Sequence, residues 1–463
     1  MRRVVVPLVV ALLAGCALKS PPAPAELQRD TLAHTPLPPQ WQAGGDASAP
    51  APADWLASFA DPPLTALVAE ALVHNADLQI AAARVAQAAG MLQVASSPLL
   101  PSVGVAGTYS GKSGGGGGLN ALFLNASLEL DVWGRLRYGE AAAQAQAEAV
   151  QADYRYARQS LAATVAKAWF LAIEAGLQSA LAQNALRAAE ELQRLAGERF
   201  RVGAGDEQAV AEAAANVGSS RDRLRQLQQS RAEALRALEL LLGRYPGADI
   251  AVAQRLSALP APVPAGLPSD LLERRPDVVA AERRVAAAFH RVGEAKAAQL
   301  PRISLTAGLS VISSDVLVLQ NRSNPGYGFG ANLFAPLYQG GALRAQVEVR
   351  DAEQQQAMAE YARIAQRSFG EVENALAADF ALRERDAILA RNVADNERAL
   401  DLALVQYRVG KVDLRAVEQR RVALYAAHAA RLRVQTDALA QRTNLYLALG
   451  GGFEAAAPSL ASR

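Results

Sequence analysis

Four stretches of the chain alternate between apolar residues and polar or small ones. They are residues 102–109, 122–132, 303–311 and 327–337. A period of two predicts β-strands, and each stretch approaches the roughly 9–11 residues that a membrane-crossing strand needs. The glycine run 114–118 and the polar run 323–326 separate the members of each pair, as loops would. The pattern therefore predicts two hairpins of amphipathic strands.

Long helical patterns surround these strands. Opening helices are predicted between Asp61 and Pro98 and between Pro268 and Pro301. After each strand pair comes a proline-free stretch, residues 135–196 and 342–409. About sixty residues at ~1.5 Å each span roughly 90 Å, far beyond an ordinary helix. These stretches are too polar to span lipid, which favours coiled-coil packing.

The chain contains this unit twice, as an internal duplication. Residues 199–203 (RFRVG) recur as residues 406–410 (QYRVG), a shift of 207 positions, and Leu100-Pro101 recurs 200 positions later. After each Val-Gly pair, an aspartate predicts the cap of a returning helix. The returning helices run to Leu242-Gly243 and Leu449-Gly450. Each unit of roughly 200 residues thus has the order helix, β-hairpin, long helix, turn, long helix.

Four amphipathic strands cannot close a membrane barrel, and lipid tolerates no open sheet edge. Several chains must therefore share one barrel. Two chains would supply eight strands with little room inside, and three would supply twelve and leave a lumen. The alanine-rich long helices suit a hollow, polar-lined helical cylinder that continues the barrel into water. The fold class is thus an α+β membrane protein with an internal two-fold repeat.

The N-terminus has the organisation of a secretory signal, residues 1–15, with arginines before a short apolar run. It ends in Leu-Ala-Gly-Cys, which resembles a bacterial lipobox, so Cys16, the single cysteine of the chain, is expected to carry the lipid. The residue after the cysteine is Ala17 and not aspartate, which resembles the sorting signal of bacterial lipoproteins destined for the outer membrane. Residues 16–60 are rich in proline and are expected to form an extended arm on the surface of the body. No transmembrane helix is expected after it.

Composition and charge leave few chemical functions open. The net charge of +2 gives no nucleic-acid signature. The four histidines are scattered, and no spacing of His, Cys, Asp or Glu fits a metal site or a catalytic group. The chain is therefore predicted to be no enzyme and to hold no cofactor apart from the lipid on Cys16.

Two segments of the chain resemble sequences of a known protein family. Residues 267–277 (LPSDLLERRPD), followed by Ala281-Glu282-Arg283, and residues 444–452 (NLYLALGGG) resemble segments of the bacterial outer-membrane efflux proteins. The chain resembles a TolC-type channel of the NodT lipoprotein subgroup over about residues 17–455. The resemblance implies a homotrimer with a shared twelve-strand outer-membrane barrel and a long periplasmic α-helical barrel. The internal duplication divides the chain into repeat 1 (61–260), repeat 2 (261–455) and a tail (456–463).

The resemblance also implies partners, a periplasmic adaptor and an inner-membrane pump. The two repeated turns match the tip at which the adaptor is expected to dock, formed by Arg201, Val202, Gly203, Arg408, Val409 and Gly410. Relatives close this end with Asp and Arg on the last long helix, but Gln419 and Val422 occupy those positions here. The nearby charged residues are the gate candidates, namely Asp413, Arg415, Glu418, Arg420 and Arg421.

The sequence thus predicts a passive outer-membrane conduit that exports small molecules delivered by a periplasmic and inner-membrane pump system. The alternative is a periplasmic coiled-coil scaffold or adaptor lipoprotein. The four period-two strands distinguish the two, because an adaptor needs no lipid-facing alternation. The exported substrates do not follow from the sequence.

Overall fold

The structure is a computed structural model that describes residues 18–44, 54–111, 117–314 and 326–452. The signal segment, Cys16 and the tail 456–463 lie outside the described residues. The chain divides into two compact units, described separately below. Unit 1 comprises residues 1–36, 82–153 and 277–365, and unit 2 comprises residues 37–81, 154–276 and 366–463.

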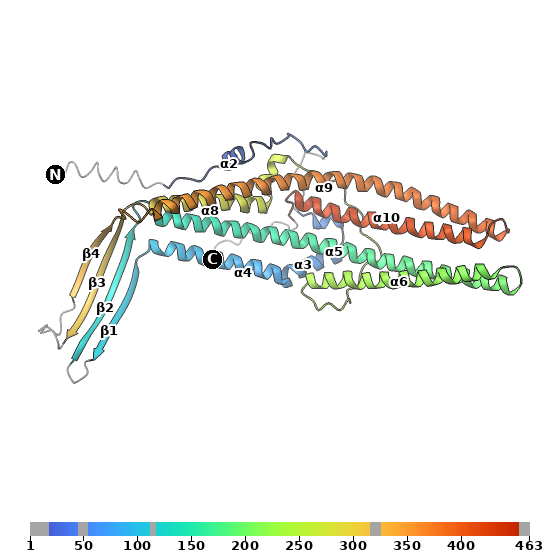
Figure 1. The fold of residues 1–463 in the computed structure, drawn as a ribbon, viewed down its shortest axis with the longest axis horizontal. Helices are drawn as coiled ribbons and strands as arrows, with labels where there is room; N and C mark the ends of the chain where they lie inside the picture. The colour runs from blue at the N-terminus through green and yellow to red at the C-terminus, as the bar shows by residue number, and fades with distance from the viewer. Residues whose placement is uncertain (1–17, 45–53, 112–116, 315–325, 453–463) are drawn as a thin grey trace. The chain divides into compact units, whose positions relative to one another are not determined.

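Unit 1 contains one antiparallel sheet of four strands in the order β1-β2-β3-β4 (Figure 1). The strands are β1 (Ser102–Gly111), β2 (Gly117–Leu130), β3 (Arg302–Ser314) and β4 (Gly326–Phe334). All four predicted strands are present, although the second ends at Leu130 rather than at residue 132 and the fourth at Phe334 rather than at residue 337. The two hairpins come from different repeats and join through β2 and β3. Among the described residues, β1 and β4 are edges with one neighbour each.

The register places every apolar set on the same face of the sheet. Val105 lies opposite Leu124, Leu124 opposite Leu309, and Leu309 opposite Tyr327. Cross-strand partners point to the same side of a sheet, so this face is apolar from edge to edge. Its large side chains are exposed in the single chain, and they include Val103, Val105, Leu122, Leu124, Leu305, Leu309, Tyr327, Phe329 and Leu333. Such a face suits contact with lipid.

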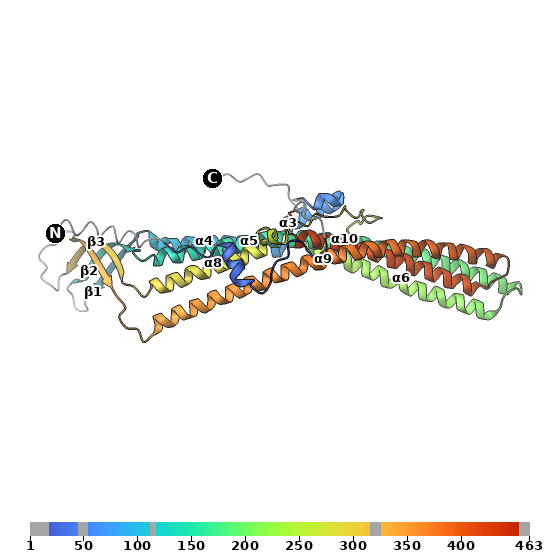
Figure 2. The same ribbon diagram turned by 90° about the horizontal axis from the view of Figure 1, so that it is seen from above.

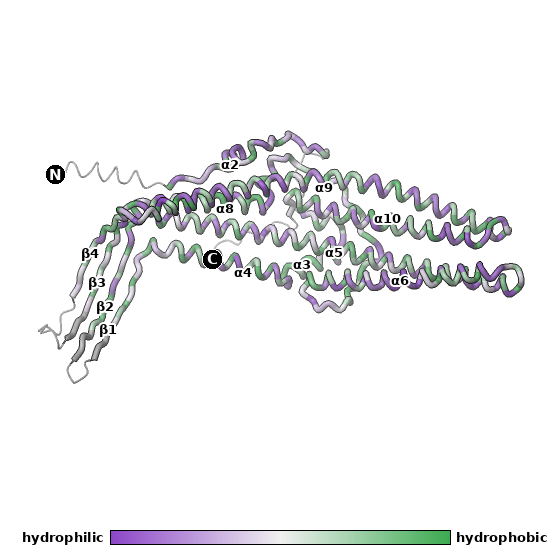
Figure 3. The backbone as a smooth tube through the Cα atoms, viewed as in Figure 1, coloured by the Kyte–Doolittle hydropathy of each residue, from purple (hydrophilic) through white to green (hydrophobic). Residues whose placement is uncertain are grey.

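The long helices repeat with equal lengths. Helices α5 (Arg135–Arg201) and α9 (Ala342–Arg408) have 67 residues each, and α6 (Glu207–Leu241) and α10 (Leu414–Ala448) have 35 each. In unit 2, α6 returns beside α5 and α10 beside α9 (Figure 2). Apolar and polar residues are mixed along the whole length of these helices (Figure 3). Of the described helices, only α5 has an 18-residue window apolar enough to span a membrane, and 56% of that window is buried within the protein.

The opening helix of each repeat is broken, which corrects the two continuous helices expected from the sequence. Asn75 separates α3 (Pro62–His74) from α4 (Ala76–Ser96), and its side chain accepts a hydrogen bond from the Leu78 amide. In the second repeat, Arg275 separates α7 (Leu271–Arg274) from α8 (Pro276–Ala297). Arg275 is extended because a residue before proline avoids the helical conformation.

The N-terminal arm is not wholly extended, because it contains α2 (Pro24–Thr31). Nor do its aromatic residues lie on the surface. In unit 2, Trp55 stacks on Tyr446 with ring centroids 5.7 Å apart, and Phe59 packs against Phe170. The exposed fractions of Trp55 and Phe59 are 1% and 2%. Burial of such large rings stabilises the core by about 1.5–3 kcal/mol each, so this part of the arm is core.

Candidate functional site

The two Arg-Val-Gly turns have the same geometry. Gly203 and Gly410 adopt φ of +71° and +73°, which confirms the helix-ending conformation expected of them. In each turn the glycine amide and the next amide donate to carbonyls of the last helical turn, as in a Schellman motif. Asp206 and Asp413 accept hydrogen bonds from the backbone amides of Ala209 and Ala416, which confirms both predicted caps.

The surroundings of these glycines differ from those of their counterparts at the other helix ends. Gly243 and Gly450 also have positive φ, but a Cβ on Gly243 would lie 2.7 Å from the carbonyl oxygen of His74. A Cβ on Gly203 or Gly410 would meet no atom within 4 Å. The flanking Val202 and Val409 are 71% and 64% exposed. The tip therefore presents apolar side chains that the described chain does not cover.

The five gate candidates on and before α10 have different environments. Asp413 is committed to its cap, and Arg415 lies 3.9 Å from Glu212. Three others follow one turn later: Glu418 bonds the side chain of Asn216 on α6, Arg421 donates to the carbonyl of Ala188 on α5 at 2.8 Å, and Arg420 is exposed. The structure thus brings Glu418 and Arg421 together against the α5–α6 hairpin and leaves Arg420 outside.

Glu418 and Arg421 line a cavity of about 470 Å³ among α5, α6, α9 and α10. Burial raises the pKa of the Glu418 carboxyl, against the opposing hydrogen bond from Asn216. Burial lowers the pKa of the Arg421 guanidinium, against the attraction of Glu418 and Glu191. Both shifts express the cost of holding charge away from water. These contacts tie α10 to the other helical hairpin of unit 2.

A buried ionic cluster joins α9, α10 and the linker between the repeats. The fully buried Arg442 guanidinium donates to both carboxylate oxygens of Asp379 at 2.8–3.1 Å. It also donates to the backbone carbonyls of Pro260 and Ala261. Arg383 donates a further hydrogen bond to Asp379. Nothing in the sequence pointed to this cluster, because a charged residue on an amphipathic helix usually lies on its solvated face.

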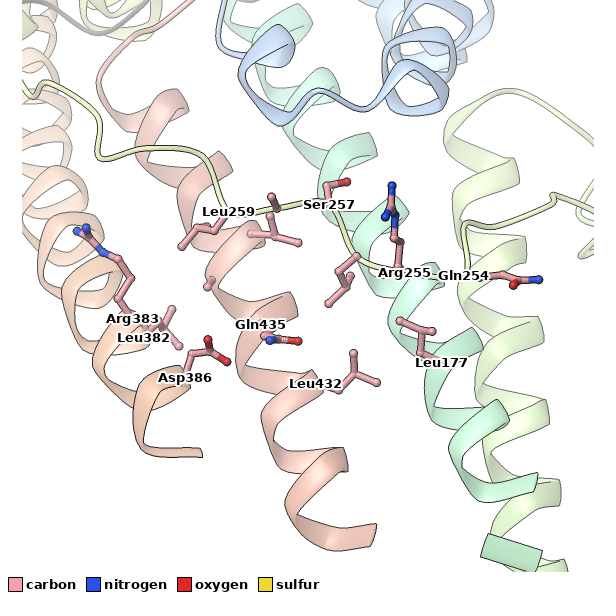
Figure 4. A pocket seen from close by; sticks show the side chains of 14 residues that line it. Leu177, Gln254, Arg255, Ser257, Leu259, Leu382, Arg383, Asp386, Leu432 and Gln435 are labelled. Atoms are coloured by element: carbon pink, nitrogen blue, oxygen red, sulfur yellow. The ribbon is translucent and has the colours of Figure 1, made fainter. Parts of the chain in front are cut away.

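A second cavity, of about 540 Å³, lies beneath the same linker (Figure 4). Leu177 of α5 and Leu432 and Gln435 of α10 line it, and the linker residues Ser257 and Leu259 pass over it. The charged side chains at its α9 wall have partners within the chain: Arg383 pairs with Asp379, and Asp386 with Arg431. In the part of the chain that the structure describes, no three His, Cys, Asp or Glu side chains cluster as metal ligands would.

Comparison with known proteins finds similar proteins over most of the chain. The family profile described as outer membrane efflux protein matches residues 67–244 and 267–451. The cation efflux system protein CusC of Escherichia coli is 31% identical over 404 residues, which cover 86% of this chain and 87% of that protein. The pyoverdine export outer membrane protein OpmQ of Pseudomonas aeruginosa is 31% identical over 423 residues, 88% of this chain and 89% of that one. The crystal structure of the Campylobacter jejuni outer-membrane channel CmeC superposes with a TM-score of 0.81 at 25% identity, over 89% of this chain and 90% of that one.

Proposed function

Since the chain belongs to the outer membrane efflux protein family, we propose that it receives cargo from an inner-membrane pump through a periplasmic adaptor. Proteins of this family are passive outer-membrane channels and not enzymes. Four strands from each of three chains form one twelve-strand barrel, so the expected fold class is confirmed. The alternative, a scaffold or adaptor lipoprotein, is wrong. One face of the sheet is apolar from edge to edge and suits contact with lipid (the lipid-type face), which an adaptor does not need.

The observation that carries the adaptor proposal is the pair of open tips. Gly203 and Gly410 end their helices with space around them, beside exposed Val202 and Val409. A partner helix end or loop can approach such a backbone closely. The relatives CusC and OpmQ are named for cations and pyoverdine. These relatives are named for chemically different cargo, so we assign the main choice of cargo to the pump.

The lipid on Cys16 remains a proposal, supported by the residues that follow it. The Lys19 amide donates to the Tyr138 hydroxyl at 3.1 Å, close to the junction of β2 and α5. Trp133 at this junction is 43% exposed, as an interfacial aromatic residue would be. The described residues that follow Cys16 thus lie beside the α5 end of the lipid-facing sheet, which supports an anchor on this side of the protein.

Intact-mass analysis of the membrane form tests the lipid. The expected result is loss of residues 1–15 and the added mass of acyl groups on Cys16, because the lipobox directs cleavage and acylation there. A Cys16→Ala variant serves as the control and should lack that added mass. A membrane form that still begins at Met1 would contradict the assignment.

Conductance in planar bilayers tests both the channel and its gate. Arg420→Ser combined with Arg421→Ser is expected to raise the single-channel conductance of the purified trimer. The first substitution removes an exposed charge at the proposed closed end, and the second releases α10 from the Ala188 carbonyl. Arg433→Ser, an exposed arginine farther along α10, is the matched control. Parent-like conductance and salt dependence in the double variant would exclude these arginines from gating.

A further inference from the structure

The polar face of the sheet carries one aromatic side chain in its middle rows. Opposite the lipid-type face, cross-strand neighbours form rows of small and polar residues. One row is Ser102, Ser127, Thr306 and Gly330, and the next is Gly104, Asn125, Gly308 and Gly328. The row after that is Ala106, Phe123, Ser310 and Gly326. In these three rows every side chain except that of Phe123 is no larger than asparagine.

The neighbours of Phe123 on this face are mostly small, and part of its ring is exposed. Its direct partners are Ala106 and Ser310, and the four diagonal positions hold Gly104, Thr108, Gly308 and Ile312. Phe123 is only half-buried. Several hydroxyl side chains of this face bond one another or the backbone: Ser102 bonds Ser127 at 2.8 Å, and Thr306 bonds the Gly330 carbonyl. Phe123 is thus an apolar projection from a hydrogen-bonded, small-residue wall.

The height of Phe123 along the strands follows from the register. Phe123 is the seventh residue of the 14-residue β2, and Glu129 marks the helix-side end of the polar face. Six residues at ~3.3 Å place Phe123 about 20 Å along the strand from Glu129. Because the apolar face meets lipid, the polar face lines the lumen. Three chains then present three Phe123 rings at one level.

We propose that the three Phe123 rings form an aromatic girdle that binds the apolar part of amphipathic organic cations passing through the barrel. An aromatic face attracts a cation as well as apolar groups. Small neighbours in the same rows let a bulky group reach the ring. The girdle rests on the channel function and adds a contact point for one chemical class of cargo.

Open-channel block by tetrapentylammonium, applied to the reconstituted trimer in planar bilayers, tests the girdle. Phe123→Leu is expected to weaken block about two- to fivefold, the loss of one exposed cation–π contact. The Phe123→Tyr channel should be blocked by tetrapentylammonium as strongly as the parent channel, because the face of the ring remains. Phe329→Leu is the matched control, since Phe329 lies on the opposite, lipid-type face of the sheet and is 86% exposed there.

The outcomes separate the girdle from the channel. A parent trimer that conducts no ions would overturn the girdle together with the channel function. A conducting parent with unchanged block in Phe123→Leu would overturn the girdle alone. Equal weakening of block in Phe329→Leu and Phe123→Leu would also overturn it, because the ring would then not face the lumen.

Discussion

Leucine at both Gly203 and Gly410 is expected to abolish export while leaving the trimer assembled. Neither site has an atom within 4 Å of an added Cβ, so the only cost to the stability of the fold is a side chain at positive φ. That conformation costs roughly 1–2 kcal/mol per residue, little for a large assembly. A leucine side chain at the tip would instead occupy the space assigned to the adaptor. Export from cells and native mass of the purified protein are the two measurements.

Two controls separate bulk from strain at the tip. Alanine at Gly203 and Gly410 has the same unfavourable φ with little bulk, so most export should survive. Gly197→Leu adds the same bulk on α5, where a Cβ also meets no atom within 4 Å and φ is not positive. It should export normally if docking is confined to the turns. Normal export by the double leucine variant would remove the docking proposal.

Asp379→Leu is expected to lower the free energy of unfolding by about 3–5 kcal/mol, the usual cost of leaving a buried charge without its partner. The buried Arg442 guanidinium would keep only the carbonyls of Pro260 and Ala261. The linker would then be less firmly held to α9 and α10. Thermal unfolding of the detergent-purified protein, followed by circular dichroism, measures the loss.

Asp437→Leu is the matched control for this prediction. Asp437 pairs with Arg433 at 3.4 Å, but their side chains are 42% and 62% exposed, so the pair contributes about 0–1 kcal/mol. Adding Arg442→Met to Asp379→Leu should recover part of the lost stability, because no unpaired charge then remains. If Asp379→Leu costs no more than Asp437→Leu, the cluster does not anchor the linker.

Local patterns carried most of the fold. Period-two alternation located four strands, and the absence of proline set the length of α5 and α9. Asp206, Asp413, Gly203 and Gly410 marked the turns correctly, because capping and positive φ depend on a few neighbouring residues. The break at Arg275 could also have been predicted from Pro276. The break at Asn75 was less visible, since asparagine is compatible with both a helix and a cap.

The candidate sites were predictable only in part. The tip residues follow from the repeat, and the gate candidates follow from charge near the last turn. The sequence could not separate Arg420 from Arg421, which are neighbours on one helix. The separation arises because only Arg421 faces α5, where the Ala188 carbonyl accepts its hydrogen bond.

The repeat, the element order and the amphipathic faces follow from the amino-acid sequence, because these are properties of short stretches of chain. Tertiary structure alone decided which distant residues meet. The pairing of β2 with β3 places Phe123 opposite Ser310, nearly two hundred positions away. The packing of α10 on α9 and the linker makes Arg442 a buried ion rather than a surface charge. Both results depend on long-range register and burial, which a local pattern of polar and apolar residues does not encode.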